Sequence, residues 1–308
     1  MKRIKSTFSI KNLENISGIK AHTIRIWEKR YNLLEPDRTD TNIRRYSLSS
    51  LQKLLNVTLL YKHGLKISKI AKLDEEEIPI LVRDIALKSS SEQVAINAFK
   101  LSMVNFDSVL FDATFDEIIA RSDFNHAFLK IFLPLMSELG ILWQTGAISP
   151  AHEHFITNLV KQKIHIQTEI SQRSQGANKN DNIFVLFLPE NEIHELAILF
   201  VNYYILSQGY KTIFLGQSIT TDSLETILTY STRMKFVTYI TVEPIKEEID
   251  EYFNNFYETI LKNSDAELAI LGPQQIHLEP NGLDEKQIKT FKTLEAFQEQ
   301  YFSTEVFV

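Results

Sequence analysis

The sequence predicts a multidomain protein of mixed class: an N-terminal winged helix-turn-helix, a helical bundle, and a doubly wound parallel α/β domain of flavodoxin-like type. Three observations support this. Short helical patterns with Arg-rich connections fill the first 75 residues, apolar residues then recur at helical spacing, and apolar strands finally alternate with helices. The 308 residues allow two to three domains. We expect domains at residues 1–75, 76–172 and 178–308.

The first helices form a helix-turn-helix pattern. Ser9 can cap a first helix, and Ser17–Gly18 can make the turn that follows it. A second helix over Lys20–Tyr31 places Ile24 and Trp27 on its inward face, three residues apart. The N-terminal end of such a second helix is the part that enters the major groove of DNA.

A short basic hairpin follows, and its last residues precede another helix. Residues 33–46 contain Arg38 and the run Asn42-Ile43-Arg44-Arg45-Tyr46, and Ser47 can cap the next helix. Residues 1–72 carry 16 Lys or Arg against 5 Asp or Glu, whereas the whole chain has a net charge of −6. A basic head on an acidic body favours nucleic-acid binding at one end; a solvated basic face is the alternative.

The middle region reads as about four helices. Apolar residues recur at spacings of three and four, and helix-breaking residues fall near Asp107, Asp123–Asn125 and Gly146–Pro150. Short connections between such helices favour an antiparallel bundle. The polar stretch Ser171–Asp181 reads as a linker.

The last region alternates strands and helices. Strands are expected at 183–189, 211–216, 235–242 and 267–271, with helices at 193–207, 222–231 and 246–262 between them. Ligands of such sheets bind beyond the carboxyl ends of the strands. His194 follows the first strand, and Glu192 beside it can orient an imidazole ring there.

Residues 7–73 resemble the MerR family of bacterial transcription regulators. The match runs through Thr23-Ile24-Arg25-Ile26-Trp27-Glu28 and the Arg44-Arg45-Tyr46 wing, although Asn42 and Ile43 stand where many members have Gly. Asn tolerates a left-handed conformation, so the turn is expected to survive. The resemblance implies a double-stranded DNA operator as partner. Trp27 and Tyr46 can also be core supports, whereas Arg44 is expected to be functional. The residues expected to contact DNA are His22, Thr23, Arg25, Arg38, Arg44, Arg45 and Tyr46.

The segment Glu192-x-His194-x-x-Ala197 resembles the motif of cobalamin-binding domains. The resemblance implies that His194 is the lower axial ligand of the cobalt. Trp143, followed by Glu153-His154, is similar to the upper-face residues of CarH/LitR-type regulators. The cofactor implied is cobalamin, in its adenosyl form, and the implied site residues are Trp143, Glu153, His154, Glu192, His194, Thr241 and Gly272.

Four positions depart from that pattern. Ala197 and Pro273 stand where the family has Gly, and Glu243 stands where an apolar residue is usual, which weakens the expected slot for the nucleotide tail. Gln144 stands where light-sensing members have a His, and an amide is a poor cobalt ligand beside imidazole.

Composition limits the remaining functions. The chain has no Cys, which excludes thiolate sensing, and no apolar run long enough to span a bilayer is evident, so we expect a cytoplasmic protein. No phosphate loop or nucleophile–base pair is found, so an enzyme or corrinoid carrier is disfavoured.

The leading hypothesis is a regulator whose DNA affinity and oligomerisation respond to cobalamin bound between bundle and α/β domain. The alternative is a cofactor-independent regulator whose last domain binds a protein or another ligand. Palindromic operators imply at least a homodimer, RNA polymerase is a further candidate partner, and repression and activation both remain open.

Overall fold

The computed structural model describes residues 7–39, 41–74, 76–78, 80–82, 92–144, 147–174, 182–230, 233–278 and 286–302. The chain forms two compact units, residues 1–160 and 161–308. The expected division at 1–75, 76–172 and 178–308 stays a prediction.

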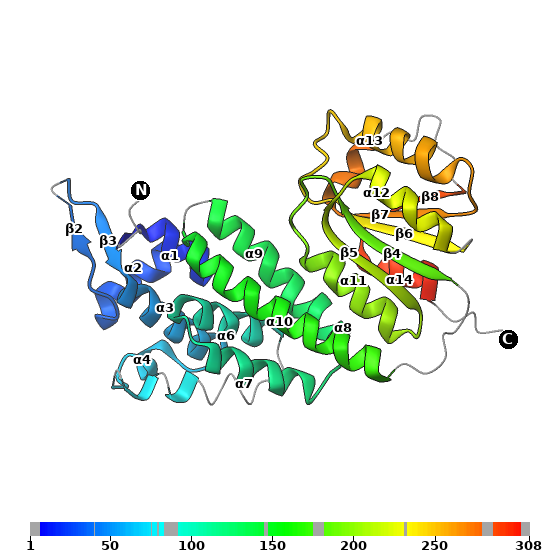
Figure 1. Ribbon diagram of the computed structural model, residues 1–308. Helices are drawn as coiled ribbons and strands as arrows, with labels where there is room; N and C mark the ends of the chain where they lie inside the picture. Colours follow the sequence, from blue (N-terminus) through cyan, green and yellow to red (C-terminus); the bar gives the residue numbers. More distant parts are fainter. Residues whose placement is uncertain are drawn as a thin grey trace. The chain divides into compact units, whose positions relative to one another are not determined.

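The first part of unit 1 is a winged helix-turn-helix (Figure 1). Its antiparallel sheet has the order β1-β3-β2. The expected caps are confirmed, because the Ser9 side chain accepts a hydrogen bond from the Asn12 amide and Ser47 does the same for Ser50. Gly18 adopts a φ of 71° at the turn and Asn42 a φ of 63° in the wing, so both left-handed positions are occupied by residues that tolerate them. The elements are β1 (Thr7–Phe8), α1 (Ile10–Ser17), α2 (Ala21–Tyr31), β2 (Asp37–Arg38), β3 (Arg44–Ser47), α3 (Leu48–Lys62) and α4 (Ile67–Ile70).

The described part of residues 92–174 contains four consecutive helical stretches, and residues 77–78 and 80–82 before them are also helical. Asp107 and Asp123 cap two of them through their side chains, because each carboxylate accepts a backbone N–H. The core is aromatic: the Phe99 ring lies 4.8 Å from that of Phe111 and 5.3 Å from that of Phe132. The stretches are α6 (Glu92–Asn105), α7 (Ser108–Ile119), α8 (Phe124–Ala127) continuing through the π-helical turn η1 (Phe128–Phe132) into α9 (Leu133–Gln144), and α10 (Pro150–Ser174).

Two expectations for this region need correction. Helix α10 continues to Ser174, so the first four residues of the expected linker at 171–181 are helical; residues 175–181 lie outside the described part. The stretch Phe124–Trp143 is long and apolar enough to cross a membrane by length and composition, contrary to the sequence reading. In the fold, 44% of its most apolar window is buried.

Unit 2 contains a parallel five-stranded sheet of order β5-β4-β6-β7-β8. Helices α12 and α13 cover one face, and α11 and α14 cover the other, which confirms the doubly wound architecture (Figure 1). The strands are β4 (Ile183–Pro189), β5 (Lys211–Ile219), β6 (Met234–Tyr239), β7 (Glu267–Leu271) and β8 (Ile288–Phe291). The helices are α11 (Leu196–Ser207), α12 (Thr221–Glu225) with η2 (Thr226–Tyr230), α13 (Ile249–Phe256) with η3 (Tyr257–Leu261), η4 (Pro273–His277) and α14 (Leu294–Phe302).

The first strand of the sheet lies at its topological switch point. The chain goes from β4 to its neighbour β5 on one side, and then returns to β6 on the other side. The loops that follow β4 and β6 therefore diverge at the carboxyl edge of the sheet, where α/β folds bind their ligands. Glu192, His194 and Thr241 all lie in these two loops.

Candidate DNA-binding surface and cofactor site

Helix α2 presents polar side chains from its first turns. His22 and Arg25 are exposed, and the Thr23 hydroxyl lies 3.3 Å from Nε2 of His22. Ile24 and Trp27 of the same helix are buried, so the helix is fixed by its apolar face. The three polar residues expected to contact DNA therefore lie on the solvent-facing part of α2.

The wing is the hairpin of β2 and β3. Its turn is held by side chains, because Nη1 of Arg38 donates to Oδ1 of Asn42 over 2.6 Å and the Ile43 amide donates to the Thr39 hydroxyl. Arg38 and Asn42 are exposed, whereas Arg45 is half-buried. The hairpin thus displays a cation at its tip.

Two wing residues have structural contacts. Tyr46 is 0% exposed, as expected of a core support and contrary to its place among the expected DNA contacts. Nε of Arg44 lies 3.0 Å from Oε1 of Glu28 on α2, and the Tyr46 hydroxyl donates to Oε2 of Glu28 over 2.9 Å. Arg44 therefore has a structural contact besides the functional role expected of it.

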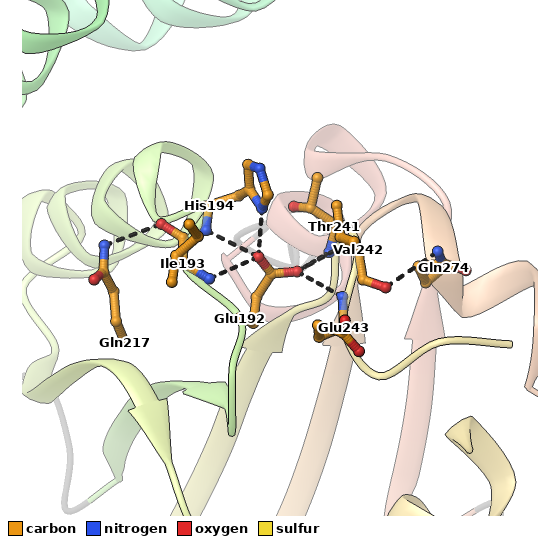
Figure 2. Close-up of polar contacts among 8 residues, drawn as sticks. All are labelled: Glu192, Ile193, His194, Gln217, Thr241, Val242, Glu243 and Gln274. Atoms are coloured by element: carbon orange, nitrogen blue, oxygen red, sulfur yellow. Dashed lines mark hydrogen bonds and ion pairs between the residues drawn. The ribbon is translucent and has the colours of Figure 1, made fainter. Parts of the chain in front are cut away.

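At the carboxyl edge of the sheet, Glu192 holds the His194 ring (Figure 2). Nδ1 of His194 lies 2.6 Å from Oε1 of Glu192, which is 0% exposed. Because a carboxylate oxygen only accepts, the proton is assigned to Nδ1, and Nε2 of the neutral ring presents its lone pair. The side chain of His194 is 52% exposed and its outer edge points away from Glu192, so a ligand can reach Nε2.

The same carboxylate joins the two loops of the switch point. Oε1 of Glu192 also accepts hydrogen bonds from the backbone amides of Ile193 and His194. Oε2 accepts hydrogen bonds from the backbone amides of Thr241, Val242 and Glu243. Burial alone would raise the pKa of Glu192, but the hydrogen bonds, led by those from Val242 and the His194 amide, leave that pKa below its usual value. Glu192 is therefore an ionised anchor that fixes His194 in position.

Thr241 lies beyond the strand in which it was expected, whereas Gly272 directly follows β7 as expected. β6 ends at Tyr239 and not at residue 242, so Thr241 lies in the loop, where its amide binds Glu192. Gly272 has a φ of 101°, and a Cβ there would lie 2.3 Å from the Ile240 carbonyl oxygen. The tight approach at Gly272 is therefore made by this chain's own backbone. Pro273 starts η4, and Ala197 is half-buried on α11.

A cavity of about 360 Å³ lies beside the Glu192 loop, at the ends of β4, β5 and β6. Four carboxylate side chains line it, and no Lys or Arg is among its lining residues. Such a lining disfavours a phosphate group through like-charge repulsion. The acidic residues are Glu190, Asp222, Glu243 and Glu248.

The expected upper-face residues lie at one end of the helical region. Trp143 is 54% exposed near the end of α9, and Glu153 and His154 belong to the first turns of α10. Nδ1 of His154 lies 2.9 Å from Oε2 of Glu153, whose Oε1 accepts the Thr157 hydroxyl. The side chain of Gln144 lies outside the described part of the chain.

The side chains at this edge of the sheet suit a metal ion that is already bound by a macrocyclic ligand. No group of three or more His, Cys, Asp or Glu residues that could hold a metal ion occurs among the described residues. A corrinoid would bring its cobalt ion already bound in the ring, so one donor atom from the protein can suffice to hold it. His194, with Nδ1 held and Nε2 outward, could supply that donor.

Comparisons with known proteins match the winged head and the helical region. Residues 8–77 match the MerR HTH family regulatory protein model, and residues 95–166 match the B12 binding domain model. The chain therefore contains a region that matches the MerR HTH family and a helical region that matches the B12 binding domain. The resemblance predicted from the sequence is thereby confirmed, as is the prediction of a regulator in place of an enzyme.

Two curated relatives come from Myxococcus xanthus. The chain is 25% identical over 224 residues to the HTH-type transcriptional repressor CarH, covering 71% of this chain and 73% of the relative. It is 25% identical over 223 residues to the HTH-type transcriptional repressor CarA, covering 71% of each chain. A monomethylamine corrinoid protein from Methanosarcina barkeri aligns with a TM-score of 0.46 and 11% identity, over 68% of this chain and 89% of that one.

Sequence reasoning missed Glu28 as a site residue. It was part of the family motif, but no role followed from its position alone. An acidic residue on the helix that carries Arg25 was the available signal, since a carboxylate beside DNA-binding cations is unfavourable without a partner.

Proposed function

We propose that this chain is a cytoplasmic transcription regulator whose DNA affinity and oligomeric state are set by cobalamin, in its adenosyl form. DNA is bound by the exposed side chains of α2 and by the wing. Arg25 and Arg38 neutralise phosphates and release counterions, and His22 and Thr23 face base edges. The operator is double-stranded, and the binding species is at least a homodimer.

The observation that carries the cofactor half of the proposal is the Glu192–His194 pair. When bound, a corrinoid would supply a cobalt ion. His194 would hold it through Nε2, while Glu192 accepts the hydrogen bond from Nδ1 and keeps the ring oriented. Trp143, Glu153 and His154 would cover the upper side.

Cofactor binding would control DNA affinity because it is thermodynamically linked to the arrangement of the domains. A ligand shifts an equilibrium only by its differential affinity for the two states. Cofactor held by residues of both the α/β domain and the bundle would favour one domain arrangement, and thereby create or remove a surface for a second copy. Two DNA-binding heads joined in one oligomer bind more tightly than one, because after the first head binds, the second is held at a high effective concentration near its site.

The test is uptake of adenosylcobalamin by the purified full-length chain, in darkness. After removal of free cofactor, the wild type should retain the corrinoid spectrum. His194→Ala should lose it, and His165→Ala, which removes an exposed histidine of α10, should behave as wild type. DNA binding and oligomeric state are then measured with and without cofactor. Uptake unaffected by His194→Ala would refute the ligand assignment, and illumination of the loaded protein tests whether light alters the complex.

A second candidate function rests on the acidic cavity. Its four carboxylates, and the Gly272 approach filled by Ile240, leave no cationic cradle for a phosphodiester tail among the described residues of this edge. The α/β domain would then bind a protein partner or another ligand, and DNA binding would be independent of cobalamin. Unchanged operator affinity and unchanged oligomeric state on addition of adenosylcobalamin would favour this function over the first.

A further inference from the structure

One buried carboxylate connects the two DNA-facing elements of the head. Glu28 belongs to α2, and both residues that it binds belong to β3. Nε of Arg44 lies 3.0 Å from Oε1 and 3.3 Å from Oε2 of Glu28, and the Tyr46 hydroxyl lies 2.9 Å from Oε2. The α2 helix and the wing strand are thus joined by side chains that are 16 and 18 positions apart in sequence.

The contact is partly shielded from water. The side chain of Glu28 is 12% exposed and that of Arg44 is 30% exposed, while Tyr46 is fully buried. Burial, followed by the hydrogen bond to Glu28, raises the pKa of Tyr46, so the phenol remains a donor. Hydrogen bonds to a charged acceptor are stronger and more directional than neutral ones.

Glu28 is unfavourable for simple attraction to DNA. It lies one helical turn from Arg25, and its negative charge offsets the cations that meet the phosphates. A carboxylate at this place therefore lowers affinity for DNA of any sequence. Its favourable contribution is the fixed separation between the helix that reads the major groove and the strand that carries the wing.

We propose that Glu28 is a positioning residue for sequence discrimination: it holds β3 on α2 so that helix and wing engage one duplex geometry together. This inference rests on the proposed DNA-binding function. Without the contact, each element still meets phosphates, but the pair no longer favours a duplex whose groove spacing matches both. Affinity for non-specific DNA is kept or increased, and the preference for operator falls.

The experiment uses the full-length chain and two duplexes. One is selected by the wild-type protein from a random library, and the other is its scrambled sequence. Glu28→Gln removes the charge and leaves one acceptor. Glu35→Gln is the matched control, because Glu35 is an exposed carboxylate just after α2 that is bonded to Asn32 and not to the wing. Fluorescence anisotropy gives the ratio of the two dissociation constants at several salt concentrations.

We expect Glu28→Gln to reduce the selected-to-scrambled preference about tenfold, the order of one charged hydrogen bond, while binding to the scrambled duplex is equal or tighter. Glu35→Gln should tighten both complexes alike and leave the preference unchanged. A preference that is equal in the two variants would overturn the proposal. Thermal melting checks that each variant is folded. If Glu28→Gln is unfolded, Tyr46→Phe tests the proposal in its place, because it removes one hydrogen bond to Glu28. Tyr46→Phe should reduce the selected-to-scrambled preference by less than the tenfold expected for Glu28→Gln.

Failure of the underlying function gives a different result. A wild-type chain that binds neither duplex at low salt would contradict the DNA-binding function itself. A wild-type chain that prefers the selected duplex, with Glu28→Gln showing the same preference, contradicts only the positioning role of Glu28.

Discussion

Replacing Glu192 by Gln should destabilise the α/β domain strongly. The two carboxylate oxygens of Glu192 accept hydrogen bonds from six N–H groups, three at each oxygen. An amide keeps one oxygen and places an NH₂ group against the other three donors. A buried donor left without an acceptor costs roughly 1–3 kcal/mol, so the expected loss for three donors is about 3–9 kcal/mol. That is a large part of the roughly 5–15 kcal/mol that stabilises an ordinary protein.

Urea denaturation followed by far-ultraviolet circular dichroism measures this loss. Glu195→Gln serves as the control, because it removes a nearby carboxylate that forms an ion pair with Lys161 and takes no part in the loop contacts. We expect a loss below about 1 kcal/mol for the control, as is usual for partly exposed pairs. A loss of stability for Glu192→Gln that is no larger than that of the Glu195→Gln control would refute the view that this carboxylate holds the two loops together.

The pH dependence supplies a second, independent readout of the same carboxylate. The pKa of Glu192 is lowered in the folded protein, so the unfolded chain binds more protons near the ordinary value of 4.5. The stabilisation is therefore present above that value and is lost as the pH falls through the lower folded pKa. The free energy of unfolding of Glu192→Gln should fall less steeply than that of the wild type over this acidic range.

Three further substitutions test separate parts of the molecule. Gly272→Ala places a Cβ 2.3 Å from the Ile240 carbonyl oxygen at a φ of 101°, so urea denaturation should show a loss of about 3 kcal/mol or more; a loss below about 1 kcal/mol would mean that the contact relaxes. Burial lowers the pKa of His152 below 6.5, so wild-type stability should decrease as the pH falls through that value, and melting of His152→Phe should not show this decrease. Arg25→Ala should weaken binding to selected and scrambled duplexes alike and reduce the slope of log affinity against log salt by about 1, as for one phosphate contact; a change confined to the selected duplex would indicate a base contact.

The helices and most strands could be predicted because their signals are local. β4 has its expected bounds, since a seven-residue apolar run buried on both faces has no competing periodicity. Asp107, Asp123 and Ser47 mark helix starts because a side chain caps a backbone amide three residues away. Such contacts span a few residues, and a sequence pattern contains them in full.

The parts that could not be predicted depend on contacts between distant segments. The β-branched run after Tyr239 reads as more strand, but Glu192, about 50 positions earlier, binds the amides of residues 241–243 and ends the ladder. β8 was missed because only Ile288 and Phe291 of its four residues are buried, which is too short a pattern to separate from a loop. Long-range hydrogen bonds and short edge strands have no local signature.

Glu28 and Glu192 show how one kind of contact would prepare two side chains for the proposed ligands. In each case a carboxylate with little exposure binds the inner nitrogen of a side chain, Nε of Arg44 or Nδ1 of His194. Arg and neutral His both have further nitrogens beyond the one that is held, and those are the groups that a phosphate or a cobalt ion would meet. Holding the inner nitrogen fixes the direction of the outer one without occupying it. The basic head and the sheet edge are therefore prepared before any ligand arrives, and the entropy of ordering these side chains is lost on folding instead of on binding.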